Sequence, residues 1–226
     1  MTRTVAPRYL HRCTPSSLPQ QFLLLELDDV SGLSLLWKDY ERNYGLAGAV
    51  VAELQWQGLL VPVGADRFVL RPEASSLSGA LAQGAAALKD RKPLSILGCI
   101  SLVPAEKIRT VFLEELVETG ALSRKQERHF VIFRRTRWRS QPGSPKGTLI
   151  EHLQQHVTVT PRHSPPSRED LLLSLLRGTK LLRSVWAKEA LEREKGAIDQ
   201  CTARAPIGRA VRRLTAVREQ FENRSS

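Results

Sequence analysis

The chain has 226 residues, 42% of them hydrophobic and 25% charged, a composition that is typical of a globular protein with a sizeable core and argues against a disordered or fibrous chain. Its 34 Lys and Arg residues against 23 Asp and Glu residues give a net charge of +11. A charge this positive predicts an anionic partner, either a nucleic acid or the cytoplasmic face of a membrane.

The cysteines and the apolar runs restrict the expected compartment and exclude a membrane span. Cys13, Cys99 and Cys201 are far apart and form no CxxC pair, which predicts a reducing compartment and argues against a zinc site. The longest apolar runs are far shorter than the ~18 residues that a membrane-spanning helix needs. We therefore expect no membrane span, no bound metal and no cofactor.

The N-terminal segment differs from the rest of the chain. Residues 1–19 contain three prolines, three arginines and no acidic residue, which indicates a flexible basic arm, with an organelle-targeting sequence as the alternative. One helical domain is expected to occupy residues 20–223. Its first helix covers residues 20–27 and is stopped by Asp28 and Asp29, which favour a turn. A short extended segment is expected at residues 33–37.

The next segment predicts the central helix of the core. Apolar side chains recur every four residues from Leu46, and the pattern predicts a helix over residues 44–57. Asn43 is the expected N-cap, and Gly58 is the expected left-handed end of the helix. Glycines and alanines within the helix make it slim, so a neighbouring helix can approach closely.

A small β-hairpin and three helices are expected after this helix. Residues 59–63 and 67–70 alternate in polarity as the two strands of a hairpin do. Helices are predicted over residues 75–89, in a short segment that begins at Pro93, and over residues 105–119. The last of these begins after a proline, carries an apolar stripe and ends before a glycine, which makes its boundaries the clearest in the chain.

Positive charge is concentrated between residues 124 and 139, where seven Lys or Arg residues and one acidic residue give a net charge of +6. We expect residues 130–133 to form a buried strand. The arginines that follow are expected to extend into solvent as a basic ribbon: Arg134, Arg135, Arg137 and Arg139. Three interpretations remain open: a membrane-facing patch, a nucleic-acid surface on which Trp138 stacks bases, or an ordinary solvated face.

The C-terminal third predicts further helices and completes the fold class. Helices are expected over residues 149–157, over 168–182 after a capping box formed by Ser167 and Asp170, and over 187–223. The fold class that follows is mainly α, a single globular helical domain with one or two small β-hairpins.

The sequence contains none of the motifs of the common catalytic sites that we sought. His152 and His156 are four residues apart and share one helix face, where they could bind a metal, but a solvated helix face is the simpler interpretation. Asp28 and Asp29 are adjacent and diverge, so they do not form an acid–base pair. We expect a protein that is not an enzyme.

An ordered set of motifs resembles one known family. The segment "FLLLELDDVSGLSLLWKDYERNYGLAGAVVAELQWQGLL" is followed by a hairpin, then by "LSGAL", "IRTVFLEELVETGAL" and "RHFVIFRRTR". This order and spacing resembles the Golgi phosphoprotein 3 family from about Phe22 to Trp138, with a weaker continuation after Ser167.

The resemblance implies a helical protein that binds phosphatidylinositol 4-phosphate on the cytosolic face of Golgi membranes. Eukaryotic members are adaptors that couple the cytosolic tails of membrane proteins to coatomer. The family's lipid pocket uses a tryptophan and three arginines, of which Trp37 and Arg109 are present here. The other two positions hold Ala47 and Glu106, so the resemblance implies altered lipid selectivity.

These departures change the expected chemistry of the pocket. Glu106 and Arg109 are three residues apart on one helix face and could pair with each other rather than with a phosphate. The basic patch between residues 124 and 139 would still attract an anionic leaflet. We therefore expect a peripheral membrane adaptor; the alternatives are a cytoplasmic prokaryotic relative with an unknown interaction, and a nucleic-acid-binding protein.

Overall fold

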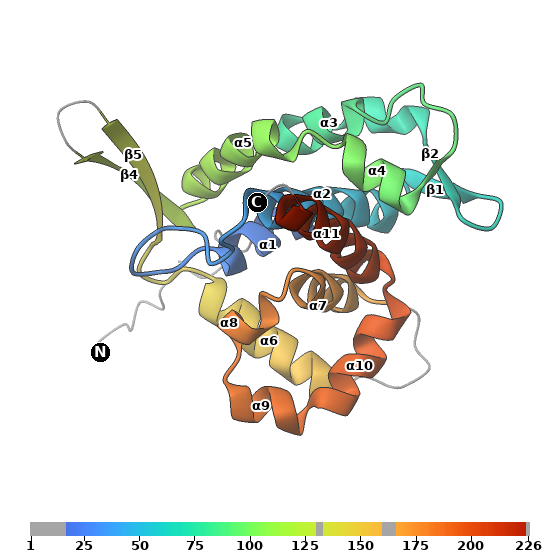
Figure 1. Ribbon diagram of the computed structural model, residues 1–226. Helices are drawn as coiled ribbons and strands as arrows, with labels where there is room; N and C mark the ends of the chain where they lie inside the picture. Colours follow the sequence, from blue (N-terminus) through green and yellow to red (C-terminus); the bar gives the residue numbers. More distant parts are fainter. Residues whose placement is uncertain (1–16, 130–132, 160–165, 225–226) are drawn as a thin grey trace, which may run out of the picture.

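The computed structural model describes residues 17–129, 133–159 and 166–224, without the side chains of residues 128, 129 and 133–135. Helices predominate in the described part, in three layers (Figure 1). The first layer holds α3 (Gly79–Ala86), α4 (Ile96–Leu102) and α5 (Ala105–Glu118). The middle layer holds α1 (Leu18–Glu26), α2 (Asp39–Trp56) and α11 (Ile207–Arg224). The third layer holds α6 (Lys146–Val159), α7 (Arg168–Gly178), α8 (Leu182–Val185), α9 (Lys188–Arg193) and α10 (Lys195–Arg204).

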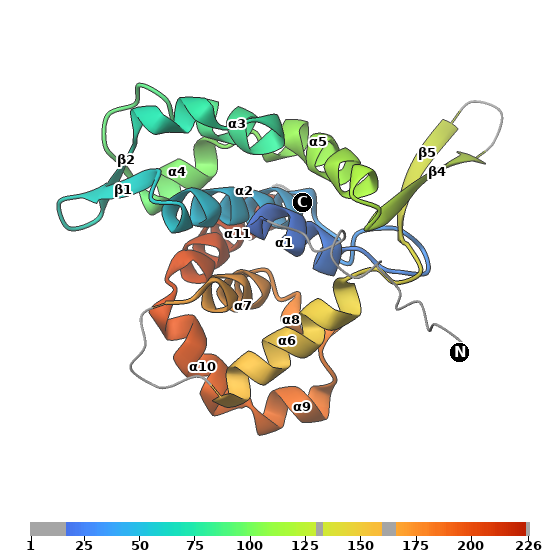
Figure 2. The ribbon, with the colours of Figure 1, turned by 180° about the vertical axis from the view of Figure 1, so that it is seen from behind.

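Two small antiparallel sheets lie at opposite ends of the helical body (Figure 2). One contains β1 (Leu60–Val63), β2 (Arg67–Leu70) and β3 (Leu94–Ser95), with Gly64 in the left-handed region at the turn between its first two strands. The other is a long hairpin of β4 (Leu122–His129) and β5 (Phe133–Ser140). The mainly α class with small hairpins is therefore confirmed.

Small residues on α2 explain why three helices pack against it. The backbone of Gly45 lies against the ring of Phe22 on α1, and that of Gly48 lies against Val211 on α11 and Leu175 on α7. A Cβ atom at either glycine would lie within 2.5 Å of a neighbouring carbon, so larger residues are excluded there. The prediction that α2 is the central helix of the core is confirmed.

Several predicted boundaries move once the chain is folded. The central helix begins at Asp39 with Lys38 as its N-cap, so Asn43 lies inside the helix rather than capping it. Acidic residues in the first turn complement the positive end of the helix dipole and support this earlier start. The first helix begins at Leu18, two residues before the expected domain start, and the expected helix over residues 75–89 is shorter, with a 3₁₀ turn (Pro72–Ser76) before it.

The C-terminal helices are also divided differently from the prediction. The capping box of Ser167 and Asp170 is present, but its helix ends at Gly178 instead of continuing to residue 182. Gly178 lies against the backbone of Gly208, and Lys180 then adopts a left-handed backbone with φ of 64°. The expected long helix over residues 187–223 is divided into α9, α10 and α11, with Pro206 between the last two.

The basic segment is a paired strand rather than a free ribbon. Residues 130–132 of the expected buried strand lie outside the described residues, and the arginines that follow belong to β5, which pairs with β4 along its whole length. The N–H of Trp138 donates to the carbonyl of Gly32 at 3.1 Å, and its side chain packs against the core. The hairpin is therefore attached at its base to the loop between α1 and α2.

Gly208 provides a test of the close contact between α7 and α11. A Cβ atom there would lie 1.8 Å from the carbonyl oxygen of Ser174, so Gly208→Ala forces the two helix backbones apart. We expect the free energy of unfolding to fall by about 3 kcal/mol in urea denaturation. The control is Gly147→Ala on α6, where a Cβ atom meets no atom within 4 Å and stability should rise slightly. Equal effects of the two substitutions would contradict this packing.

Candidate functional site

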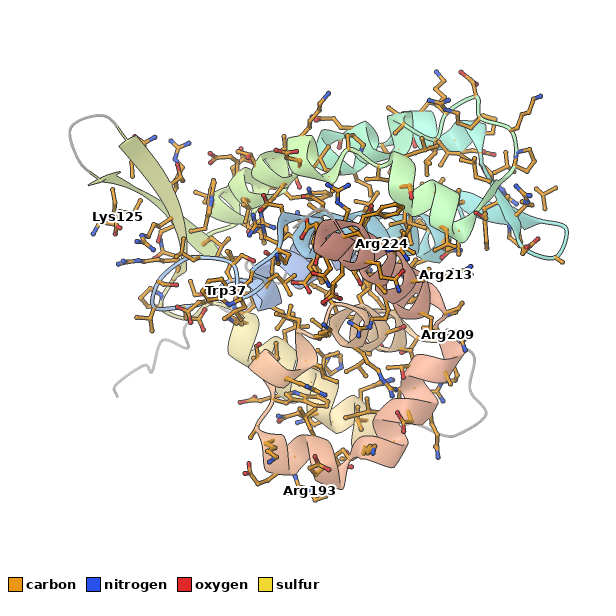
Figure 3. All side chains as sticks on the ribbon, viewed as in Figure 1. Trp37, Lys125, Arg193, Arg209, Arg213 and Arg224 are labelled. Carbon is orange, nitrogen blue, oxygen red and sulfur yellow. The ribbon has the colours of Figure 1, made fainter. Side chains whose placement is uncertain are left out.

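Trp37 lies at the end of the loop that joins α1 to α2, and its side chain extends into solvent (Figure 3). The residue is 93% exposed, whereas its neighbour Leu36 is 6% exposed and packs in the core. A large aromatic ring with this exposure gains nothing from core packing. The folded chain therefore presents Trp37 outward, on an anchored segment of backbone.

Hydrogen bonds within the loop fix the position of this backbone. The hydroxyl of Ser34 donates to the Glu26 carboxylate and accepts from the N–H of Leu36 at 3.0 Å. The guanidinium of Arg42, on the first turn of α2, donates to the carbonyl of Leu36 at 3.1 Å. Asp28 accepts from the N–H of Ser31 at 2.7 Å, and this bond lowers the pKa of Asp28. The expected turn role of Asp28 is confirmed.

Arg109 stabilises the same loop through an ion pair with Glu26. Its Nη1 atom lies 2.7 Å from Oε2 of Glu26, and the two side chains are 18% and 0% exposed. Because the cost of burying a charge is offset only by a close partner of opposite sign, this pair is a structural constraint on α1, α5 and the loop. The expected pair with Glu106 is not formed: among the described ion pairs, Arg109 bonds to Glu26 and Glu106 takes part in none.

A groove of about 650 Å³ lies beside Trp37. It is formed by the start of α2, the connection from α4 to α5, the first turn of α5 and the end of α11. Its lining includes Trp37, Lys38, Asp39, Tyr40, Asn43, Tyr44, Ala47, Ile100, Ser101, Val103, Pro104, Ala105, Glu106, Lys107, Arg218 and Glu222. Ala47 and Glu106, the positions where the resemblance implies arginines, therefore lie on the groove, whereas Arg109 does not line it.

The charges around the groove nearly cancel. Three cations, on Lys38, Lys107 and Arg218, face three carboxylates, and Glu222 lies 3.3 Å from Lys38 and 4.0 Å from Arg218. Burial raises the pKa of Tyr40, and the carboxylates of Glu222 and Glu219 raise it further. The groove thus offers an anion much less positive charge than a pocket with three arginines would.

The hairpin arginines are partly neutralised. Arg137 contacts Glu127 at 2.6 Å and donates to the carbonyl of Ser31 at 2.9 Å, while Arg139 lies 3.3 Å from the same glutamate. The hydrogen bond from Arg137 lowers the pKa of Glu127. Arg137 is 14% exposed and Arg139 is 38% exposed, so the expectation of a solvent-facing ribbon is wrong for Arg137. The side chains of Arg134 and Arg135 lie outside the described residues.

His156 is not on a solvated helix face. It is 13% exposed, and its Nε2 atom lies 3.0 Å from the Asp170 carboxylate. Arg204 donates to both oxygens of that carboxylate, at 2.9 and 3.1 Å. Burial acts to raise the pKa of Asp170, but hydrogen bonds from Arg204, the N–H of Ser167 and His156 hold it below its usual value.

This cluster is also the one group of potential metal donors found in the described part of the chain. Cys201 lies next to His156 and Asp170, with the donor atoms of all three within 4.8 Å of one another. Because Arg204 already uses both carboxylate oxygens, a metal ion would have to displace a buried guanidinium. The arrangement is that of a salt-bridged network joining α6, α7 and α10. Burial raises the pKa of the Cys201 thiol to about 11, which disfavours the thiolate that a metal requires.

Comparison with known families identifies the chain. The family model described as Golgi phosphoprotein 3 (GPP34) matches residues 18–218, which is nearly the whole chain. The chain therefore belongs to the Golgi phosphoprotein 3 family, a family of non-enzymatic adaptors that associate peripherally with the Golgi. No curated protein matches the sequence. Across the described ranges, no helix has both the length and the apolar character needed to span a bilayer.

Removal of the Arg109 guanidinium tests whether this residue is a structural brace. Arg109→Met leaves Glu26 charged and buried, so the free energy of unfolding should fall by about 3 kcal/mol, measured by urea denaturation. Combining it with Glu26→Gln should recover most of that loss. The control is Arg124→Met, whose pair with Glu114 is half exposed and contributes less than about 1 kcal/mol. A loss for Arg109→Met no larger than the control's would contradict the brace.

Proposed function

We propose that this protein is a peripheral membrane adaptor that docks on anionic cytosolic leaflets by inserting Trp37, with phosphatidylinositol 4-phosphate as the headgroup it meets beside the groove. Membership of the Golgi phosphoprotein 3 family supports the adaptor role and a site of action at the Golgi. The observation that carries the docking mechanism is the 93% exposure of Trp37 on a loop that the ion pair between Glu26 and Arg109 stabilises.

The surroundings of Trp37 suit a membrane interface. On the last turns of α11, Val217 and Phe221 are 45% and 61% exposed and lie four residues apart, so they share a helix face. The end of α11 lies beside the Trp37 loop, as the contact between Lys38 and Glu222 shows. Indole and phenyl rings favour the boundary between headgroups and acyl chains. We propose that these two side chains add to Trp37 in a shallow insertion surface.

Positive charge holds this surface near an anionic leaflet. Lys38, Lys107 and Arg218 border the groove, and the exposed Arg224 ends α11. Each cation close to an anionic surface contributes about 1 kcal/mol, and salt screens this attraction. The net charge of +11 adds a longer-range attraction of the same sign. We expect reversible binding that is sensitive to ionic strength.

The preference for one headgroup is expected to be modest. Lys107 forms no ion pair among the described residues and lies on the groove, so it is the cation best placed to meet a phosphate. Glu106 lies beside it, and Ala47 supplies no charge. Arg109 acts as a positioning residue for the loop rather than as a phosphate ligand, because its guanidinium is bonded to Glu26. Cytosolic tails of membrane proteins are the protein partners that an adaptor of this family implies.

Nucleic acid is the less favoured partner. The indole of Trp138 packs against the core rather than standing free between arginines, so it does not offer an open stacking platform for bases. Arg137 and Arg139 already bond to Glu127, which reduces the charge available to a phosphate backbone.

Substitution of Trp37 tests the docking mechanism. Trp37→Ala should weaken binding to vesicles of phosphatidylcholine and phosphatidylserine by about tenfold or more, because the inserted indole is lost, while thermal stability stays the same. Vesicle flotation measures the binding. The matched control is Trp56→Ala, since Trp56 is 47% exposed at the far end of α2. If both variants bind as the unchanged protein does, Trp37 does not insert.

Vesicles with phosphatidylinositol 4-phosphate separate headgroup selectivity from general charge attraction. At equal total charge, these vesicles should bind the protein only slightly better than phosphatidylserine vesicles, and Lys107→Gln should remove the difference. Identical binding to both vesicles would leave docking by Trp37 intact but exclude selective recognition of that headgroup.

A further inference from the structure

A hollow of about 930 Å³ lies among the C-terminal helices, away from the groove beside Trp37. It lies between α7, α8, α9, α10 and α11, and its lining shares no residue with that groove. The part of the chain between residues 177 and 212 supplies all of it. No motif in the sequence indicated this site, because its members come from several short helices and their connections.

Cations from six different segments border this hollow. They are the exposed side chains of Arg177, Lys180, Arg183, Lys188, Lys195 and Arg212. Its two acidic residues are Glu192 and Asp199, and Asp199 already pairs with Arg177 at 2.5 Å. The other five cations form no ion pair with any residue that the structure describes. Four of the six positive charges are therefore uncompensated.

The positive surface continues beyond this hollow. A neighbouring hollow of about 740 Å³ shares Arg177 and Arg212 with it and adds Arg209 and Arg213. Both of the added arginines are exposed and lie on α11 (Figure 3). Elsewhere in the described structure, arginines such as Arg42, Arg168 and Arg204 are held in ion pairs. Seven cations that form no ion pair among the described residues therefore border these two adjoining hollows.

The backbone at Lys180 is a second, independent observation. Lys180 follows the C-cap of α7 and has φ of 64°, a left-handed conformation that glycine adopts without strain and other residues rarely adopt. A lysine at this position costs stability, and strain of this kind gathers at functional sites. Lys180 is one of the residues that line the hollow. A ligand that needs this charge explains why the position does not hold glycine.

We propose that this hollow binds a compact anion that carries several phosphate groups, such as an inositol polyphosphate or the headgroup of a multiply phosphorylated phosphoinositide. A volume of about 930 Å³ is within the range of small-molecule sites. Arg and Lys side chains arranged around a cavity suit phosphate oxygens that point in several directions. The apolar lining residues are Leu182, Leu191 and Ile198, and none of the described lining residues is aromatic, so a nucleotide base finds no ring on which to stack.

Isothermal titration calorimetry of the full chain with inositol hexakisphosphate tests the proposal. The test variant combines Arg183→Gln, Lys188→Gln and Lys195→Gln, all at exposed positions. We expect the affinity to fall by about tenfold or more, because three phosphate contacts are lost. The control combines Lys89→Gln, Arg91→Gln and Lys92→Gln, which remove the same charge from another exposed segment and should change affinity less than about twofold.

A second variant separates binding from folding. Lys180→Gly relieves the left-handed strain while removing one cation from the hollow. The midpoint of thermal unfolding should stay the same or rise, whereas the affinity for inositol hexakisphosphate should fall. If the affinity stays unchanged, the lysine has no role in the site, and the proposal loses its second observation.

Four outcomes decide the assignment. Absence of binding at low salt both to soluble inositol hexakisphosphate and to vesicles with phosphatidylinositol 4,5-bisphosphate overturns the proposal. Equal weakening in the test and control triple variants also overturns it, because it would show unselective charge attraction. Tighter binding of single-stranded RNA that the test triple variant abolishes would also overturn it, in favour of a macromolecule. Binding to vesicles with phosphatidylinositol 4,5-bisphosphate but not to the soluble compound would support the site and assign its ligand to a lipid.

The Trp37→Ala variant distinguishes this inference from membrane docking. It should retain full affinity for soluble inositol hexakisphosphate even though its vesicle binding is weakened. The two functions can therefore fail separately, since the hollow and the Trp37 loop have no residue in common.

Discussion

The ion pair between Glu26 and Arg109 is the constraint on which the exposed surface depends. Glu26 is fully buried at the end of α1, where an unpaired carboxylate would be strongly destabilising. Arg109 on α5 neutralises it, and the hydroxyl of Ser34 in the loop after α1 also bonds to it. This one carboxylate therefore joins two helices to the loop that presents Trp37. A loop backbone held in place this way loses little conformational entropy when its indole enters a membrane.

The chain combines the fold of the Golgi phosphoprotein 3 family with a less positive groove. The resemblance to the family implies arginines where this protein has Ala47 and Glu106, and the described groove has as many carboxylates as cations. Interface insertion and diffuse charge can hold such a protein on a membrane without a strong pocket. The C-terminal hollow instead has five cations without an ion pair among the described residues, so the two surfaces divide attachment and anion recognition between different elements.

Local signals predicted the elements, and long-range contacts determined the site. The end of α5 at Gly120, the capping box at Ser167 and the small residues of α2 are visible within a few positions of sequence, and the structure confirms them. The partner of Arg109 is 83 residues away, so spacing favoured the neighbouring Glu106 instead. The end of α7 depends on a backbone contact with Gly208. The C-terminal hollow depends on cations between residues 177 and 212, which come together only when the helices fold.

Quenching of Trp37 fluorescence by brominated lipids would test the central claim most directly. In a chain with Trp56→Phe, Trp138→Phe and Trp186→Phe, Trp37 is the one remaining tryptophan of the four. We expect strong quenching by bromine on the acyl carbons nearest the headgroup, and weaker quenching when Arg109→Met removes the brace. Absence of quenching in vesicles that retain the protein, or quenching that Arg109→Met leaves unchanged, would contradict the account.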